Sequence, residues 1–220
     1  MARGTVQLSH TALEVDEAID RSLKNKEEID QLKNEILLLR GLNAPFKIYS
    51  TYEEIGEDGW YYIRANPTAE GTYFLERSST NDVTFIGTKK TGNAGDAQKW
   101  GFVGFIGGFY IYNKAAGHSH VLIGVTSAPT KMVLMGDSGS GALNQNCVWN
   151  IAPAGVAVSR PNISSSRDSA ILPAFSLQTF IDNKVLYLNK NGSANTCATW
   201  NQRDGGSTLV LEKDETEVQH

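Results

Sequence analysis

The residues best suited to chemistry lie in the run Gly136-Asp137-Ser138-Gly139-Ser140-Gly141. A serine nucleophile needs a histidine base and a buried aspartate that orients the histidine, and these residues come from distant parts of a chain. His118 and His120 instead lie shortly before Ser138, and His10 belongs to the N-terminal segment. We therefore expect the run to be a glycine-rich turn.

Paired carboxylates also occur, at Glu53-Glu54 and Glu57-Asp58. A glycosidase needs two carboxyl groups at a set separation across a cleft, and adjacency in the sequence does not supply this. No set of nucleophile, base and orienting residue can be assembled from these groups. We expect no catalytic residue and no enzymatic activity.

Metal and cofactor sites are not indicated either. His118 and His120 alternate without a nearby cysteine or carboxylate, so metal-ligand spacing is absent. Cys147 and Cys197 stand 50 residues apart, and we expect two free, buried thiols. A disulfide is the alternative. If the two cysteines occupy equivalent positions in a structure with threefold internal symmetry, it requires both positions to lie near the symmetry axis. We expect no metal and no cofactor.

Charge narrows the choice of partner. The chain of 220 residues has a formal net charge of −4. Residues 43–211 hold 13 basic and 12 acidic groups and are almost neutral. Nucleic-acid binding needs a basic patch for phosphate contacts, and none is visible. No apolar run approaches the roughly 20 residues that span a bilayer. We expect neither nucleic-acid binding nor membrane insertion.

An internal repeat organises most of the chain. Trp100, Trp149 and Trp200 fall 49 and 51 residues apart. Short β-branched and aromatic runs, separated by turn residues, precede each tryptophan. The expected strands are 59–63, 72–75 and 83–87 in the first unit, 108–112, 120–123 and 132–136 in the second, and 155–158, 175–178 and 184–188 in the third. Three units of about four strands predict a closed all-β domain.

The aromatic residues of this domain have two expected roles. Trp100, Trp149 and Trp200 recur once per unit, and we expect them at equivalent core positions. Other aromatic residues lie beside polar neighbours, where an exposed ring can stack on a sugar. The candidate sugar-stacking residues are Trp60, Tyr61, Tyr112 and Tyr187. Half-buried packing is the alternative for these four.

Residues 15–40 contain no glycine, proline or aromatic residue and predict a helix. The spacing of Ile29, Leu32, Ile36 and Leu39 is that of a coiled-coil seam, which continues backwards through Asn25 and Ser22. We expect the chain to form a homotrimer through Ile29, Leu32, Ile36 and Leu39, with a dimer as the alternative. The other alternative is a single amphipathic helix that packs on its own domain.

The sequence around Trp100 resembles a known family. Gln98-Lys99-Trp100 matches the Gln-x-Trp signature of the ricin-B-type β-trefoil lectins, while Trp149 and Trp200 lack the glutamine. The resemblance covers residues 45–212 and implies an all-β fold, a β-trefoil. In these lectins a sugar site combines an aspartate, an aromatic platform and a polar residue near Gln-x-Trp. The sequence alone does not place that set in any unit.

The N-terminal run from Met1 to Asp20 resembles N-termini of virion proteins from tailed phages of gut Bacteroidetes, of the crAss-like kind. This resemblance implies a virion fibre, assembled in the bacterial cytoplasm and attached to phage capsid or tail proteins through its N-terminus. The expected segments are an anchor at 1–14, an α-helical coiled coil at 15–42, a β-trefoil at 43–212 and an acidic tail at 213–220.

Three functional hypotheses follow. The first is a non-enzymatic structural protein, a short head or tail fibre that displays a trefoil. The second is a lectin-like receptor-recognition module that binds a host-surface glycan, and it is compatible with the first. The third is an intracellular bacterial adaptor, which accounts for the helix but not for the resemblance of the N-terminal run.

Overall fold

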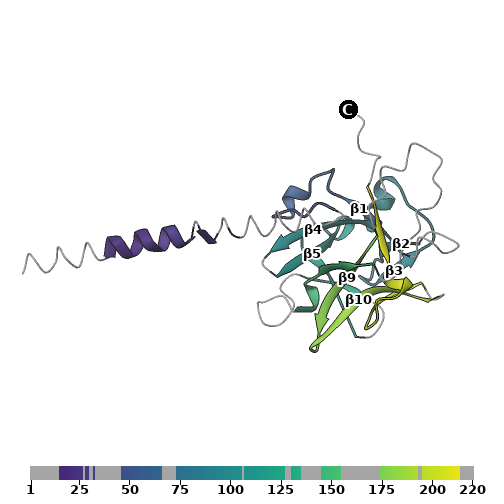
Figure 1. Cartoon of the computed structure of the whole chain (residues 1–220). Helices are drawn as coiled ribbons and strands as arrows, with labels where there is room; N and C mark the ends of the chain where they lie inside the picture. The colour runs from purple at the N-terminus through teal and green to yellow at the C-terminus, as the bar shows by residue number, and fades with distance from the viewer. Residues whose placement is uncertain are drawn as a thin grey trace, which may run out of the picture.

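The computed structural model describes residues 15–26, 28, 29, 32, 46–65, 73–105, 107–126, 130–134, 145–154, 174–192 and 195–213. Figure 1 shows that strands dominate these residues. The strands are β1 Tyr61–Ala65, β2 Tyr73–Arg77, β3 Val83–Ile86, β4 Lys99–Phe105, β5 Gly108–Asn113, β6 His120–Ile123, β7 Lys131–Leu134, β8 Asn150–Pro153, β9 Phe175–Ile181, β10 Lys184–Asn191, β11 Thr196–Trp200 and β12 Leu209–Lys213. The short 3-10 helices are η1 Glu53–Ile55, η2 Gly92–Gln98, η3 Lys114–Ala116, η4 Gln145–Cys147 and η7 Gly205–Ser207.

Six strands close into an antiparallel barrel. β1 pairs with β4, β4 with β5, β8 with β9, β9 with β12, and β12 pairs back onto β1. The remaining contact, between β5 and β8, is made by Phe109 and Trp149, whose backbones exchange hydrogen bonds of 3.0 and 2.9 Å. Closure leaves no free sheet edge in this ring.

The other six strands form three hairpins, β2–β3, β6–β7 and β10–β11. Each unit therefore contributes two barrel strands and one hairpin between them. Backbone hydrogen bonds join the hairpins to one another, from Val83 to Thr130 and from Thr130 to Cys197. A six-stranded barrel with three such hairpins has the strand connectivity of a β-trefoil, which agrees with the expected all-β domain.

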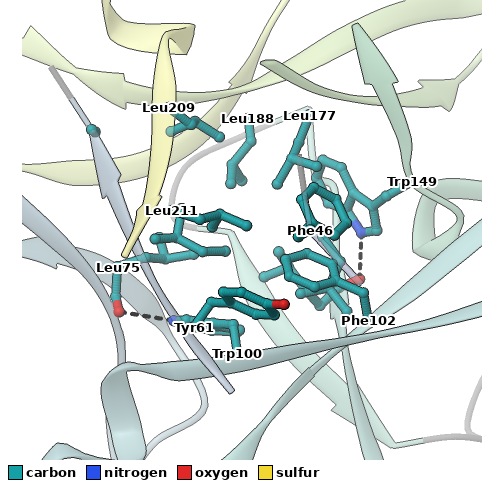
Figure 2. Close-up of a cluster of buried hydrophobic side chains, with 14 of the residues drawn as sticks. Phe46, Tyr61, Leu75, Trp100, Phe102, Trp149, Leu177, Leu188, Leu209 and Leu211 are labelled. Carbon is teal, nitrogen blue, oxygen red and sulfur yellow. Dashed lines mark hydrogen bonds between the residues drawn. The ribbon is translucent and has the colours of Figure 1, made fainter. Parts of the chain in front are cut away.

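The barrel core contains two of the three repeated tryptophans. Trp100 and Trp149 are fully buried, and each indole Nε1 donates a 2.9 Å hydrogen bond to a leucine carbonyl, Leu75 for the first and Leu122 for the second (Figure 2). These bonds satisfy the only polar atom of each ring inside an apolar core. The prediction of equivalent core positions is confirmed for this pair.

Trp200 corrects the prediction for the third unit. It ends β11, a hairpin strand, and its side chain is 51% exposed. The residue equivalent to Trp100 and Trp149 is Leu209, because each of the three lies two residues after a 3-10 helix and is fully buried. The sequence predicted 175–178 and 184–188 as the second and third strands of this unit, whereas the corresponding β9 and β10 are its first and second strands. The expected strand at 155–158 lies outside the described residues.

The segment before η1 completes the barrel core. Phe46 is 4% exposed and stacks on Phe102 with 3.9 Å between ring centroids. Figure 2 shows its ring among Tyr61, Phe102 and Trp149. Tyr49 then runs parallel to β4, with its N–H 2.9 Å from the Phe102 carbonyl and its carbonyl 2.8 Å from the Gly104 N–H. The trefoil therefore needs this segment as well as its twelve strands.

Residues 15–26 are helical, and so are residues 28, 29 and 32. Every described residue of this helix is exposed, including Val15, Ile19, Leu23, Ile29 and Leu32 at 50–57%. The alternative in which the helix packs on its own domain is therefore not seen in this part of the chain. Ile36 and Leu39 of the expected seam, and the anchor at 1–14, lie outside the described residues.

Candidate functional site

The three units carry different side chains at one pair of equivalent positions. One position comes directly after a buried leucine of the second strand in each unit, which is Leu75, Leu122 or Leu188. The other position is the last residue of the 3-10 helix, two residues before Trp100, Trp149 or Leu209. In the first unit these residues are Glu76 and Gln98, and Gln98 Nε2 donates to Glu76 Oε2 at 2.8 Å. The Gln-x-Trp glutamine therefore has a structural partner on β2.

The first-unit pair is closed by further polar contacts. Lys90 Nζ donates to Glu76 Oε1 at 2.7 Å, and the Lys90 backbone N–H donates to Gln98 Oε1 at 2.8 Å. Gln98 is fully buried, and its Nε2 also donates to the Thr88 carbonyl at 2.9 Å. Because these groups satisfy one another, this unit offers little unpaired polarity to a ligand.

In the second unit the two positions hold Ile123 and Cys147, which both belong to an apolar cluster. Burial raises the pKa of the Cys147 thiol to about 11, so the thiol stays protonated at neutral pH. Cys197 is on β11 and is likewise free and buried. The expectation of two free thiols is confirmed, and the two are not at equivalent positions.

The third unit keeps a buried polar pair, Asn189 and Ser207, which is bonded to the exposed Asp204. Asn189 Nδ2 donates to Ser207 Oγ at 2.9 Å and to Asp204 Oδ1 at 2.8 Å. Asp204 Oδ1 also accepts from the Ser207 backbone N–H at 3.2 Å. The side chain of Asp204 is exposed, and its Oδ2 accepts no hydrogen bond from the described residues. This oxygen is available to a polar ligand.

Beside this polar pair lies an exposed sheet face that we call the Trp200 face. It is a row of four residues across β8, β9, β10 and β11, formed by the register pairs of Asn150 with Gln178, Gln178 with Tyr187, and Tyr187 with Trp200. By strand spacing the row is about 14 Å long. Asn150, Gln178 and Tyr187 are half-buried and Trp200 is 51% exposed.

The Trp200 face extends towards the β9–β10 turn. Phe180 and Val185 pair two residues further along and are 40% and 43% exposed. The turn itself is Asp182-Asn183, and both residues have positive φ, 48° and 61°, as a two-residue type I′ hairpin requires. This tight turn fixes the register and so places Phe180, Val185, Tyr187 and Trp200 on one side of the sheet.

Three of the four candidate sugar-stacking residues are corrected by the structure. Trp60, Tyr61 and Tyr112 are 5%, 7% and 5% exposed, so their ring faces are covered. Trp60 and Tyr112 pack with Tyr52 in the same apolar cluster as Cys147, and burial raises the pKa of Tyr112 to about 12. Tyr61 belongs to the barrel core, whereas Trp60 and Tyr112 lie on the other side of the sheet, where the segment around Tyr49 and Ile55 covers them. Tyr187 remains a candidate, beside Trp200.

The other sequence candidates do not form a site among the described residues. His118 packs its ring against Tyr52 at 5.9 Å between centroids, and Ser119 Oγ bonds to His120 Nδ1 at 2.9 Å. Within the described ranges, no three His, Cys, Asp or Glu side chains are grouped to hold a metal ion. No helix in these ranges is long and apolar enough to cross a membrane. Gly136–Gly141 lies outside the described residues.

Comparison with known proteins gives structural likenesses only. No protein-family model and no curated protein matches the chain. A ricin B-like lectin from Macrolepiota procera, solved with lactose, matches with a TM-score of 0.41 and 17% identity over 72% of this chain and 98% of the lectin. A Culex salivary protein of the Cysteine and Tryptophan-Rich family matches at 0.43 and 14%, over 71% and 94%.

A GlcNAcα1-4Gal-releasing endo-β-galactosidase from Clostridium perfringens matches with a TM-score of 0.45 and 14% identity. The likeness covers 71% of this chain and 32% of the galactosidase. Similarities at this level assign neither a sugar nor a reaction to this chain. The fold rests on the strand pairings, and the candidate site rests on the Trp200 face.

Proposed function

We propose that this chain is a glycan-binding module and that the Trp200 face is its binding surface. The observation that carries the proposal is the half-exposed Trp200 ring in a row that ends in the amides of Gln178 and Asn150. Sugar rings present C–H groups to an aromatic face and hydroxyls to amides and carboxylates. Asp204 Oδ2 supplies a further acceptor beside this row.

The composition of the face favours a neutral ligand. Its described side chains are aromatic, aliphatic or amide, and the exposed charged residues Lys184, Arg203 and Asp204 lie near these residues in the sequence. A compact face with one large exposed ring is also typical of surfaces that bind other proteins. The polar row distinguishes the glycan proposal, because hydroxyl recognition needs several oriented donors and acceptors.

The proposal is tested by glycan-array screening of the full chain, followed by calorimetry with the best ligand. Trp200→Ala should lower affinity at least about tenfold, equivalent to about 1.4 kcal/mol, and Trp200→Phe should lower it less because a ring remains. Lys89→Ala, on a surface of the first unit, is the matched control and should bind normally. Binding that is unchanged in Trp200→Ala would contradict the proposal.

We further propose that the module is displayed on a phage particle as a short head or tail fibre. This proposal is supported by the resemblance of the N-terminal run to phage virion proteins and by the exposed helix that follows it. In this setting the N-terminal segment attaches to capsid or tail proteins and the trefoil faces the host. Mass spectrometry of purified particles, with immunogold labelling, tests the location, and absence from particles would refute it.

A further inference from the structure

The Trp200 face has a covered side and an open side. Leu186 and Leu188 are buried, so Tyr187 between them lies on the outer side of the sheet, because side chains alternate along a strand. Asn189, two residues after Tyr187, is on the same outer side and is 6% exposed. Val185, two residues before Tyr187, is 43% exposed. The outer side of β10 is therefore covered at Asn189 and exposed at Val185.

The segment around η7 forms the covered side. Ser176, on the outer side of β9, donates from its Oγ to the Ser207 carbonyl at 2.7 Å. Asn189 Nδ2, on the neighbouring strand, donates to Ser207 Oγ at 2.9 Å. These two bonds hold η7 along one side of the row that crosses β8, β9, β10 and β11. Asp204, the residue before η7, brings its exposed carboxylate to the same side.

The opposite side of the row is open among the described residues. Pairing of β8 with β9 reaches only to Gln178, and pairing of β11 with β10 reaches only to Tyr187. Beyond these positions Phe180 and Val185 pair with each other and with no other described strand. A pocket for a small ligand buries most of the ligand's surface. A row with one wall would leave a single sugar largely exposed, so the affinity must come from several sugars in line.

The spacing of the row fits an extended chain of sugars. Its four positions are one strand spacing apart, about 4.8 Å, which is close to the length of one sugar ring in an extended glycan. Tyr187 and Trp200 place rings at two neighbouring positions, and Gln178 and Asn150 place amides at the other two. Over its length of about 14 Å the row therefore spans about three consecutive sugars.

The flat shape of the row also discriminates between kinds of chain. In cellulose and in mannan the bonds between rings leave equatorially from opposite sides of each ring, so the chain extends as a flat ribbon. In amylose the chain coils, and successive rings turn away from a sheet face. An acidic chain is disfavoured as well, because its carboxylates would meet the exposed carboxylate of Asp204.

We propose that the Trp200 face binds about three consecutive sugars of a neutral, ribbon-like polysaccharide whose rings are joined through equatorial bonds. This inference rests on the proposed glycan-binding function and names the class of ligand for the same surface. The chain lies across β8, β9, β10 and β11, and hydroxyls along one of its edges donate to Asp204 Oδ2. A single terminal sugar is a poor ligand for this face.

The ligand class is tested by calorimetry of the full chain with defined oligosaccharides. Cellohexaose and mannohexaose are the ribbon-like probes, cellobiose and mannobiose are their short forms, and maltohexaose is the coiled control. At least one ribbon-like hexasaccharide should bind at least about tenfold more tightly than its disaccharide, which exceeds the gain from additional binding frames alone. The same hexasaccharide should bind more tightly than maltohexaose.

The outcomes separate this inference from the proposed function. A disaccharide or maltohexaose that binds as tightly as both ribbon-like hexasaccharides overturns the inference. So does binding of some other glycan through Trp200 when neither ribbon-like hexasaccharide binds, and in both cases the glycan-binding function stands. If no glycan binds, either here or on the array, the proposed function itself is overturned.

The placement of the chain along the row is tested by variants at its two ends. Asn150 and Trp200 are three strand spacings apart, so a disaccharide stacked on Trp200 does not reach Asn150. Asn150→Ala should lower the ratio of hexasaccharide to disaccharide affinity at least about threefold, whereas Trp200→Ala should weaken both ligands. Asn93→Ala, exposed in η2, is the matched control and should bind both normally. An unchanged ratio in Asn150→Ala, with an unchanged near-ultraviolet circular dichroism spectrum, overturns this placement.

Discussion

At the scale of single residues, the indole N–H of Trp100 and of Trp149 donates a hydrogen bond to a buried leucine carbonyl, and a phenylalanine ring has no donor for it. Phenylalanine in either place would leave a buried leucine carbonyl without its donor. We expect Trp100→Phe or Trp149→Phe to lower the free energy of unfolding by about 1–3 kcal/mol in urea titrations. Trp200→Phe, at an exposed site, should stay within about 0.5 kcal/mol. Equal losses at all three would contradict the corrected unit boundaries.

The buried thiols give a dependence of stability on pH. Burial raises the pKa of Cys147 to about 11 and that of Cys197 to about 12, from an ordinary value of 9.0. Well below pH 9 the two thiols are protonated in the folded and in the unfolded chain, so they do not make stability depend on pH. As pH rises further, the thiols ionise in the unfolded chain first, and stability falls until the folded values are passed.

We therefore expect the free energy of unfolding, measured by urea titration, to fall between about pH 9 and pH 12, by up to about 3 kcal/mol for Cys147 and up to about 4 kcal/mol for Cys197. The double variant Cys147→Ala, Cys197→Ala should be less stable at pH 8 but lose less on further alkalinisation. Some slope should remain, because burial also raises the pKa of Tyr112 to about 12. Parallel pH curves for the variant and the wild type would contradict this assignment.

At the scale of the elements, the sequence predicts the first two units and misplaces the third. The spacing of Trp100 and Trp149 is visible because both units keep the large aromatic residue. The third unit has Leu209 at the equivalent place, 60 residues after Trp149, and Trp200 by chance lies near the expected spacing. Leu209 fills the same core position but makes no hydrogen bond like that of the indole N–H. The packing of the third unit is therefore maintained, although its sequence no longer shows the repeated tryptophan.

The segment before η1 is an element that the repeat does not reveal. Phe46 contacts Phe102, Phe109 and Phe175, which come from three different barrel strands. Its removal would leave a cavity that several strands share. We expect Phe46→Ala to lower the free energy of unfolding by about 3–5 kcal/mol.

A truncation series checks the same element. A chain that starts at residue 46 should fold, whereas one that starts at residue 51 should lose the Phe46 packing and the Tyr49 bonds to β4. Comparable melting temperatures for the two truncated chains would show that the segment is dispensable. Ile48→Ala, at a half-buried neighbouring position, serves as the milder control.

At the scale of the whole molecule, the sequence named one residue of the proposed site. Tyr187 was identified from its polar neighbours, but Trp60, Tyr61 and Tyr112 share the same local pattern and are buried. Local pattern does not say which side of a closed barrel a residue faces, because that depends on the register of strands distant in sequence. The pair of Asn189 and Ser207 was equally invisible, since it joins positions 18 residues apart.

The proposed site and the coiled coil expected from the sequence together predict how the whole chain binds a surface. A parallel coil would hold several Trp200 faces in one particle, so binding to an immobilised glycan should gain from multivalency. We expect the full chain to bind a glycan-coated surface about 100-fold more tightly than a chain that starts at residue 46. Calorimetry with the free glycan should give the same affinity per site for both chains. Ile29→Lys, in the expected seam, should behave like the truncated chain on the surface, while Trp200→Ala should lose binding in both assays. If the truncated chain matched the full chain on the surface, the coil would have no part in adhesion.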